Sequence, residues 1–174
     1  MTLSQLSDPS TLATAAAIVA LLLLSAFFSG SETALTAASR AKLRAMADRG
    51  QPGARRALRL TEDSESLIGA ILLGNNLVNI LSASLATALF TRLVGEGGVA
   101  IATLVMTVLV LVFAEVLPKT YAITAPETAA TRVAGPVALV VRLFAPVVAA
   151  VRTLVRGILS VFGVRTDPTL NVLS

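Results

Sequence analysis

The sequence contains no cysteine, histidine or tryptophan among its 174 residues, and aromatic side chains make up only 4% of it. Without cysteine there is no disulfide, and without cysteine and histidine there is neither a Cys/His zinc site nor a histidine base. Charged residues are also scarce, at 14% of the chain against about 25% in soluble domains. Hydrophobic residues make up 55%, and the mean hydropathy is +0.83. The composition therefore predicts an all-α integral membrane protein.

The positive charge of the chain is concentrated in one segment. The net charge is +4 and the pI about 10.7, which by themselves would suit a nucleic-acid-binding protein. Seven of the fourteen Lys and Arg residues, however, lie between Arg40 and Arg59, beside an apolar segment. Such clustering is typical of a cytoplasmic loop, so we expect the lipid bilayer as a partner and no nucleic acid. No basic stretch precedes the first apolar run, and no cleaved signal peptide is expected.

Three apolar segments, at about residues 12–30, 67–90 and 98–118, are long enough to cross the membrane, which takes about 20 residues. The charged stretch between the first two is divided by Gln51-Pro-Gly53, which predicts two short cytoplasmic helices. With this basic loop inside, the N-terminal tail (1–11) lies outside the cell and the C-terminal tail (163–174) in the cytoplasm. We therefore expect a multi-pass protein of the cell (inner) membrane, with one transmembrane domain over residues 12–162.

A further apolar region, at about residues 135–162, is expected to lie along the membrane rather than across it. On a helical wheel its Arg142, Arg152 and Arg156 fall within an arc of about 80°. A basic stripe opposite an apolar face is typical of an amphipathic helix in the interface. Two internal prolines would let such a helix bend around a bundle. The sequence favours this juxtamembrane belt helix over a fourth span, which stays the alternative.

The most informative residue is Glu115, a lone carboxylate in the third apolar segment. A charge at membrane depth is expensive, so it indicates an ion path, a proton relay or a paired structural charge. On the first segment, Ser25 and Ser29 lie about one helical turn apart and share a face. Gly30 and the polar residues beside it weaken the helix there, which makes Ser29 or Ser31 a candidate N-cap of the following helix. For a single serine, close helix packing is the plain alternative.

The second apolar segment carries a cluster of amides. Asn75, Asn79 and Ser82 share one face of the expected helix. One asparagine in a membrane helix often only bonds a neighbouring helix. An unsatisfied amide in hydrocarbon costs several kcal/mol, so the whole cluster must face partners, water or an ion.

Pro118 and Lys119 follow Glu115 in the third segment. Because proline has no N–H, Pro118 cannot donate to the carbonyl of Ala114, and its ring disrupts the preceding turn. A backbone carbonyl freed in this way is tolerated in a membrane only where it is buried or lines a cavity, and there it can bind a cation. Alternatively, Glu115 and Lys119 form an i, i+4 ion pair with no ion involved.

Hydroxyl, amide, carbonyl and carboxylate oxygens from three helices suit a hard cation such as Mg²⁺ or Na⁺. The sequence offers no sulfur or imidazole that would favour zinc, copper or nickel. One carboxylate leaves a divalent ion incompletely neutralised, which suits a site that must release its ion. These residues predict a membrane cation transporter without naming the ion.

Three motifs resemble the transmembrane domain of the CorC/cyclin M (CNNM) magnesium transporters. They are Phe27-Phe-Ser-Gly-Ser-Glu-Thr-Ala34, Leu72-Leu-Gly-Asn-Asn-Leu-Val-Asn79 and Phe113-Ala-Glu-Val-Leu-Pro-Lys119. The resemblance covers about residues 12–162. It implies three transmembrane helices, a pair of short cytoplasmic helices, a belt-like juxtamembrane helix and a homodimer.

The function that the resemblance implies is export of Mg²⁺ in exchange for Na⁺. Carried over by motif, the ion ligands are Ser25, Ser29, Asn75, Asn79 and Glu115. The backbone carbonyls of Gly30 and Ala114 would complete the coordination shell. Behind these ligands, and not in contact with the ion, would lie Ser82, Pro118 and Lys119. Many relatives have glycine where this chain has Ala114. Relatives also continue into paired nucleotide-binding regulatory domains, so we expect this chain to be one part of a longer protein.

Two other functions compete with transport. In the first, the domain is a non-transporting sensor or anchor that regulates magnesium homeostasis, and its polar residues hold a dimer together. In the second, a serine and Lys119 form an intramembrane catalytic dyad. The chain has no histidine, and Lys119 is expected at the interface beside Glu115, so we expect no enzyme.

Overall fold

The computed structural model describes residues 8–162, and every secondary-structure element in this part of the chain is a helix. The elements are α2 (Pro9–Ala37), α3 (Arg40–Asp48), α4 (Pro52–Glu62), α5 (Ser64–Val94), α6 (Gly98–Leu109), the π-helical η1 (Val110–Val116), α7 (Leu117–Thr124) and α8 (Pro126–Val161). The all-α prediction is confirmed. Residues 1–7 of the predicted N-terminal tail and all of the C-terminal tail (163–174) lie outside the described residues.

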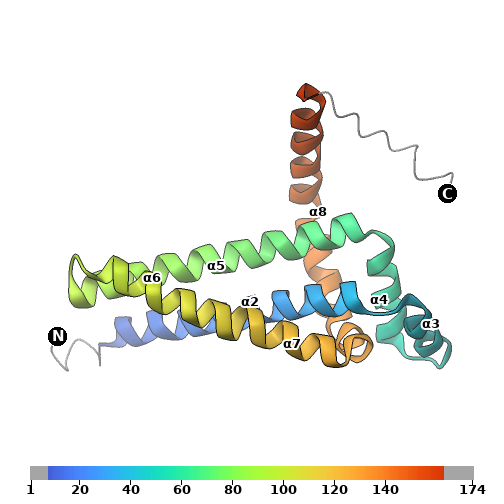
Figure 1. Ribbon diagram of the computed structural model, residues 1–174, viewed down its shortest axis with the longest axis horizontal. Coiled ribbons are helices and arrows are strands. Elements are labelled where there is room, and N and C mark those ends of the chain that lie inside the picture. Colours follow the sequence, from blue (N-terminus) through green and yellow to red (C-terminus); the bar gives the residue numbers. More distant parts are fainter. Residues whose placement is uncertain (1–7, 163–174) are drawn as a thin grey trace.

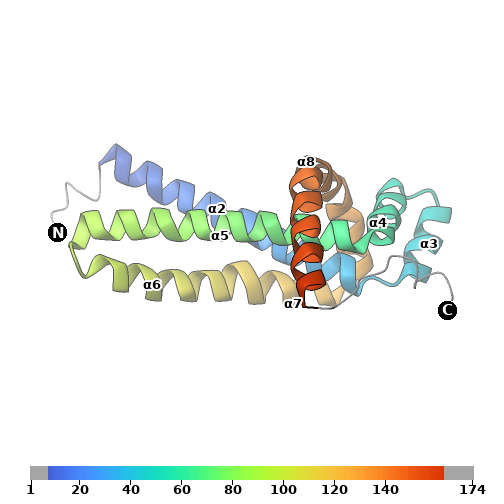
Figure 2. The ribbon, with the colours of Figure 1, turned by 90° about the horizontal axis from the view of Figure 1, so that it is seen from above.

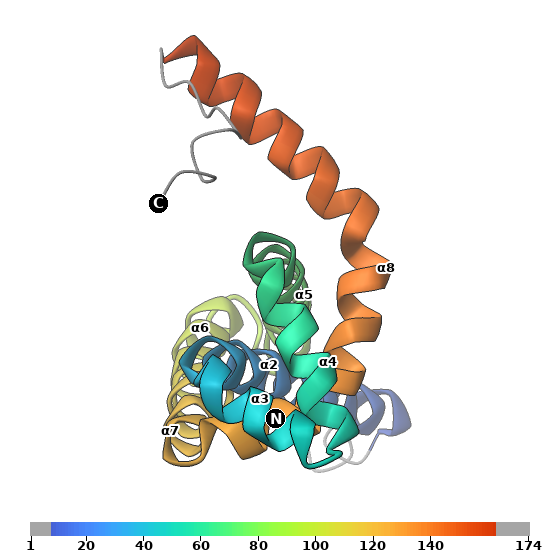
Figure 3. The ribbon, with the colours of Figure 1, turned by 90° about the vertical axis from the view of Figure 1, so that its right-hand side faces the viewer.

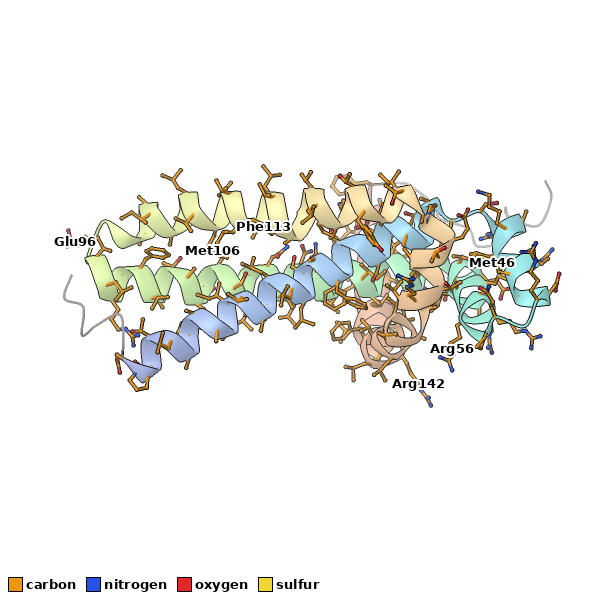
Figure 4. All side chains as sticks on the ribbon, turned by 90° about the horizontal axis from the view of Figure 1, so that it is seen from below. Met46, Arg56, Glu96, Met106, Phe113 and Arg142 are labelled. Carbon is orange, nitrogen blue, oxygen red and sulfur yellow. The ribbon has the colours of Figure 1, made fainter. Side chains whose placement is uncertain are left out.

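Three long rods lie side by side and form the body of the molecule (Figures 1 and 2). They are α2, α5 and the continuous helix Gly98–Thr124, which joins α6, η1 and α7. Each contains one of the three predicted apolar spans. The tight turn that holds Glu96 lies at one end of the rods, and the charged helices α3 and α4, with Met46 and Arg56, lie at the other (Figure 4).

The prediction of two short helices in the charged stretch is confirmed by α3 and α4, which are separated at Arg49–Gln51. The prediction of a cap at Ser29 or Ser31 is wrong. Helix α2 runs through both residues to Ala37, and Ser39 stands at the N-cap of α3. A break at Ser29 would leave backbone N–H and C=O groups unpaired inside the bundle, whereas a continuous helix pairs them.

Helix α8 runs across the rods rather than along them, and its last turns extend away from the bundle (Figures 1 and 3). Ala130, Ala134 and Val137 in its first half are fully buried. Further along, Val148 packs on Gly69 of α5. Arg152 lies 3.3 Å from the carboxylates of both Asp63 and Glu65 at the start of α5, which ties the second half of α8 to the bundle.

The prediction of exactly three membrane spans is not confirmed. By length and composition, four described helices could cross a membrane, and α8 is the fourth. It also begins at Pro126, earlier than the predicted belt of 135–162, and Pro136 and Pro146 do not end it. The physical reason is that its arginines are spaced widely enough to leave long apolar stretches, so composition alone does not separate a belt from a span.

Two apolar clusters hold the rods together, one toward each end. Ile18, Ala86, Leu89 and Met106 join α2, α5 and α6 near the tight turn. A larger cluster, which includes Leu35, Leu43, Ile71 and Val137, joins α2, α3, α5 and α8 at the opposite end. Many leucines and valines on the outer faces are exposed, among them Leu23, Ile80 and Leu104. A surface this apolar requires lipid around it.

Candidate cation site

Polar side chains from the three rods meet between the two apolar clusters. From α2, the Ser25 hydroxyl contacts the amide oxygens of Asn75 and Asn79 on α5, at 2.9 Å and 2.7 Å. Also from α2, Ser29 donates to Glu115 Oε2 at 3.1 Å. From α5, Asn75 Nδ2 donates to Glu115 Oε1 at 3.2 Å. The five predicted ligand side chains therefore form one connected cluster, although they come from positions 25 to 115.

Hydrogen-bond accounting shows that this cluster has more acceptors than protons. The amide of Asn75 is oriented by its bond to Glu115, so its oxygen must face Ser25. The Ser25 hydroxyl has one proton for two amide oxygens. Either Asn79 turns its NH₂ toward Ser25, or a cation among the three oxygens relieves their repulsion. With the Asn79 oxygen facing Ser25, as in this structure, three oxygens meet there and the arrangement is electronegative.

Glu115 is the acidic member of the cluster, and it is paired with a lysine. Its Oε2 lies 3.1 Å from Lys119 Nζ, one turn later on the same rod. The same ammonium lies 4.0 Å from Glu32 Oε2 on α2. Among the residues that the structure describes, no three carboxylates gather into one cluster. The predicted Glu115–Lys119 pair is therefore present, and Glu115 carries the single negative charge within the ligand cluster.

Close helix approach at two glycines brings the ligands within reach of one another. A Cβ on Gly74 would lie 2.6 Å from the Phe28 ring, so the absence of a side chain lets α2 and α5 meet beside Ser25 and Asn75. A Cβ on Gly30 would lie 3.3 Å from Pro118 Cβ, where α2 meets α7. The glycines in two motifs thus have a packing role as well as any role in binding.

Glu115 lies in the π-helical segment η1, just before Pro118. There the Leu117 N–H donates to the Val112 carbonyl, five residues back instead of four. Pro118 has no N–H, so it donates neither to Ala114, four residues back, nor to Phe113. The predicted disturbance of this turn is confirmed. Such π-helical turns often occur at functional sites, because they change the direction of side chains and free carbonyls.

The remaining predicted residues lie near the cluster but do not all join it. Ala114 is fully buried, and Gly30 packs on Pro118. Ser82 is also buried, but its hydroxyl donates to the Asn79 carbonyl of its own helix and not to the cluster. The backbone roles of Gly30 and Ala114 stay predictions.

A groove of about 520 Å³ adjoins the cluster between α5 and the third rod. Asn79 and Glu115 line it, together with Thr103 and Thr107 of α6. Each threonine hydroxyl donates to the carbonyl four residues back, which leaves its lone pairs available to a ligand. The sequence reasoning missed both threonines. Their spacing of one helical turn, in register with Glu115 two turns later, is the signal that could have found them.

The chain is similar to several bacterial proteins. It is 44% identical over 144 residues to the UPF0053 inner membrane protein YfjD of Escherichia coli, which covers 83% of this chain and 34% of that protein. It is 36% identical over 157 residues to a UPF0053 protein of Haemophilus influenzae, covering 90% of this chain and 37% of the relative. A polyamine export protein of Salmonella typhimurium is 29% identical over 144 residues, covering 75% and 32%.

The chain spans about a third of the length of these relatives. The sequence pattern of the cyclin M transmembrane N-terminal domain matches residues 16–173, which is most of the chain. This match includes the helices that carry Ser25, Asn75 and Glu115. Together with the apolar rods, it identifies a multi-pass membrane protein. The chain belongs to the family of the cyclin M transmembrane N-terminal domain (CNNM).

Proposed function

We propose that this domain carries Mg²⁺ out of the cell in exchange for Na⁺, through a dehydrated site centred on Glu115. The observation that carries the proposal is the convergence of two hydroxyls, two amides and one carboxylate from three helices. Oxygen ligands of these kinds suit Mg²⁺, which prefers six of them in octahedral geometry. Backbone carbonyls near Pro118 would add further oxygens. The role requires no covalent chemistry, so we propose no enzymatic activity.

The charge balance supports a site that releases its ion. One carboxylate neutralises half of the charge of Mg²⁺, and the nearby Lys119 ammonium opposes the ion. Binding is then weak enough for turnover, since transport requires both entry and exit. A monovalent ion such as Na⁺ would be neutralised by the same carboxylate, which gives a physical basis for competition at one site.

Flux measurement tests the proposal. The protein is reconstituted into vesicles loaded with Mg²⁺ and a fluorescent Mg²⁺ indicator, and Na⁺ is supplied on the opposite side. We expect Na⁺-dependent loss of Mg²⁺ that empty vesicles do not show. Mg²⁺ binding without any flux would instead favour the sensor or anchor function, and neither binding nor flux would leave Glu115 as a structural charge.

Lys119 is expected to compete with the transported cation for Glu115. Lys119→Gln removes a positive charge about 3 Å from the carboxylate, and two like charges at such distances repel by about 1 kcal/mol or more even in water. We therefore expect Mg²⁺ affinity to rise by about tenfold. Calorimetry of the detergent-solubilised variant measures this change. Arg142→Gln, an exposed charge on α8, is the control; a Lys119→Gln variant that binds less tightly would contradict competition.

We further propose that α8 follows the cytoplasmic surface of the membrane, with α3 and α4 inside the cell and the N-terminus outside. The basic residues of α3 and α4 support this orientation. Helix α8 runs across the three rods (Figure 3), so if the rods span the bilayer, α8 cannot run parallel to them through it, although it is itself long enough. Its Arg152 reaches Asp63 at the end of the rods where α3 and α4 also lie.

A single cysteine at Thr153 tests this arrangement, because the native chain has no cysteine. Thr153 is exposed and lies on the arginine side of α8, so in the proposed arrangement it faces water rather than lipid. Val148 is buried against Gly69 and unsuitable for labelling. We expect a membrane-impermeant thiol reagent to label Thr153→Cys in inside-out vesicles and not in intact cells. A cysteine replacing Glu96, in the tight turn, should give the reverse pattern. Labelling of Thr153→Cys from outside would make α8 a fourth span.

A polyamine is the second candidate cargo, because a relative is a polyamine export protein and the groove beside Glu115 is mostly apolar. Methylene groups would lie on Ile80 and Met106 while one ammonium met Glu115 and Asn79. Competition by spermidine in the Mg²⁺ binding measurement distinguishes the two cargoes.

Finally, we propose that the protein is a homodimer, as the family resemblance implies. Mass photometry in detergent measures this oligomeric state.

A further inference from the structure

A second cavity, of about 200 Å³, lies between α2, α7 and α8, outside the cation cluster. Its wall is mostly carbon, contributed by residues such as Phe27, Pro118 and Val133. Four residues with polar side-chain groups also line it: Ser31, Tyr121, Thr128 and Arg132. The proposed transport mechanism uses none of this polar chemistry, so the cavity needs its own explanation.

Ser31 is buried without a hydrogen-bond partner. The residue is 1% exposed, and its hydroxyl makes no hydrogen bond to any described residue. Other hydroxyls in the helices, such as those of Thr36 and Ser84, donate to a carbonyl of their own helix. Leaving a buried hydroxyl unpaired is costly, so an acceptor oxygen that enters the cavity would supply the missing partner.

Arg132 supplies a positive charge beside this apolar cavity. It is exposed, and among residues 8–162 it has no salt-bridge partner, whereas Arg152 on the same helix is paired with Asp63 and Glu65. The cavity thus offers an apolar wall, a buried hydrogen-bond donor and a cationic residue. A molecule that matches all three has a hydrocarbon chain, an acceptor oxygen next to it and an anionic group beyond.

We propose that this cavity binds part of one acyl chain and the ester and phosphate region of an anionic phospholipid. Ser31 would donate to the ester oxygen, and Arg132 would pair with the phosphate or the anionic head group. The protein lies in a bilayer, so this ligand is present at high local concentration on its surface. Basic residues attract anionic lipids in this way at the edge of a membrane.

The lipid site shares structural elements with the cation cluster. Gly30 and Pro118 line the cavity and also contact each other. Ser29 immediately precedes Gly30, and Glu115 lies one turn before Pro118, so occupancy of the cavity would restrain both helices that form the Ser29–Glu115 hydrogen bond. The lipid would therefore stabilise the cation-binding arrangement without contacting the ion.

Native mass spectrometry tests the proposal on protein taken from vesicles of equal phosphatidylglycerol and phosphatidylcholine. We expect the wild type to retain phosphatidylglycerol in preference to phosphatidylcholine. Arg132→Gln should lower this preference by about fivefold, the contribution of one basic residue near an anionic membrane. Arg142→Gln, an exposed arginine of the same helix outside the cavity, should not change it. Ser31→Ala should lower the retention of both lipids, because both have ester groups.

Several results would overturn the proposal. Equal losses in Arg132→Gln and Arg142→Gln would show only general attraction to a basic surface. If Arg132→Gln retained phosphatidylglycerol as well as the wild type does, or if the wild-type protein held no lipid, the cavity would not be a site for an anionic phospholipid. Equally tight binding of glycerol 3-phosphate would reassign the site to a soluble anion. Size-exclusion profiles and melting temperatures of the variants establish that each remains folded.

Discussion

Glu115→Gln is expected to abolish measurable Mg²⁺ binding while the helical bundle stays folded. The substitution removes the one carboxylate of the ligand cluster but keeps an oxygen of similar size that Ser29 can still bond. It also leaves the Lys119 ammonium without its closest anion, so a positive charge then opposes the incoming ion. Losing one partner of such a charged contact costs about 2–5 kcal/mol, so affinity should fall at least about 30-fold.

Calorimetric titration of Mg²⁺ into purified protein in detergent measures this effect, with and without high Na⁺. The matched control is Glu32→Gln, which removes a carboxylate 4.0 Å from the same lysine but outside the ligand cluster. We expect Glu32→Gln to bind Mg²⁺ with nearly the affinity of the wild type. High Na⁺ should weaken Mg²⁺ binding to both of these proteins. Mg²⁺ affinity retained by Glu115→Gln would exclude Glu115 as a ligand and favour a structural Glu115–Lys119 pair.

Gly98→Ala is expected to give the second large effect, on the stability of the bundle. A Cβ at this position would lie 2.5 Å from the Phe90 carbonyl group and from the Thr91 nitrogen, all backbone atoms that no rotamer change can move. Overpacking typically costs 1–3 kcal/mol, and a 2.5 Å contact with backbone atoms places this cost in the upper part of the range, above the roughly 1 kcal/mol that alanine gains over glycine in a helix. Helices α5 and α6 would have to separate.

The adjacent residue provides the control for this experiment. Gly97 has a φ of −70° and no atom within 4 Å of a Cβ placed on it, so Gly97→Ala should change stability by less than about 0.5 kcal/mol. In detergent, the melting temperature of Gly98→Ala should be lower than that of the wild type by roughly 5 °C, and the melting temperature of Gly97→Ala should be close to it. Equal melting temperatures for the two variants would show that the α5–α6 contact is not tightly packed.

Much of the candidate site could be predicted because its signals are local. Ser25 with Ser29, and Asn75 with Asn79, each share a helix face through the spacing of four residues. Glu115 stood out as a charge in an apolar run. The resemblance of the three motifs placed them together on three helices. Their direct contacts, at 2.7 to 3.2 Å, depend on how closely the helices approach, and no helical periodicity contains that information.

Other elements were misjudged because local preference and tertiary packing disagree. The Ser29-Gly-Ser31 segment contains residues that favour a helix end, yet α2 continues because Gly30 packs on Pro118 and the buried backbone needs its own hydrogen bonds. Ser82 shares the face of Asn75 but bonds its own backbone. Helix α8 is long and apolar enough to span, and its direction across the rods follows from contacts such as Val148 on Gly69.

The sequence by itself determined that this protein is a helical membrane protein with three long apolar rods, one basic charged stretch and an oxygen-rich polar cluster. These features depend on composition and on the period of the α-helix, and both can be read along one segment at a time. Only the tertiary structure decided that α2 is unbroken, that Lys119 also lies near Glu32, and that Ser31 has no partner in its cavity. Each of these depends on which side chains of distant segments meet, because desolvation and close packing act between helices and not along them.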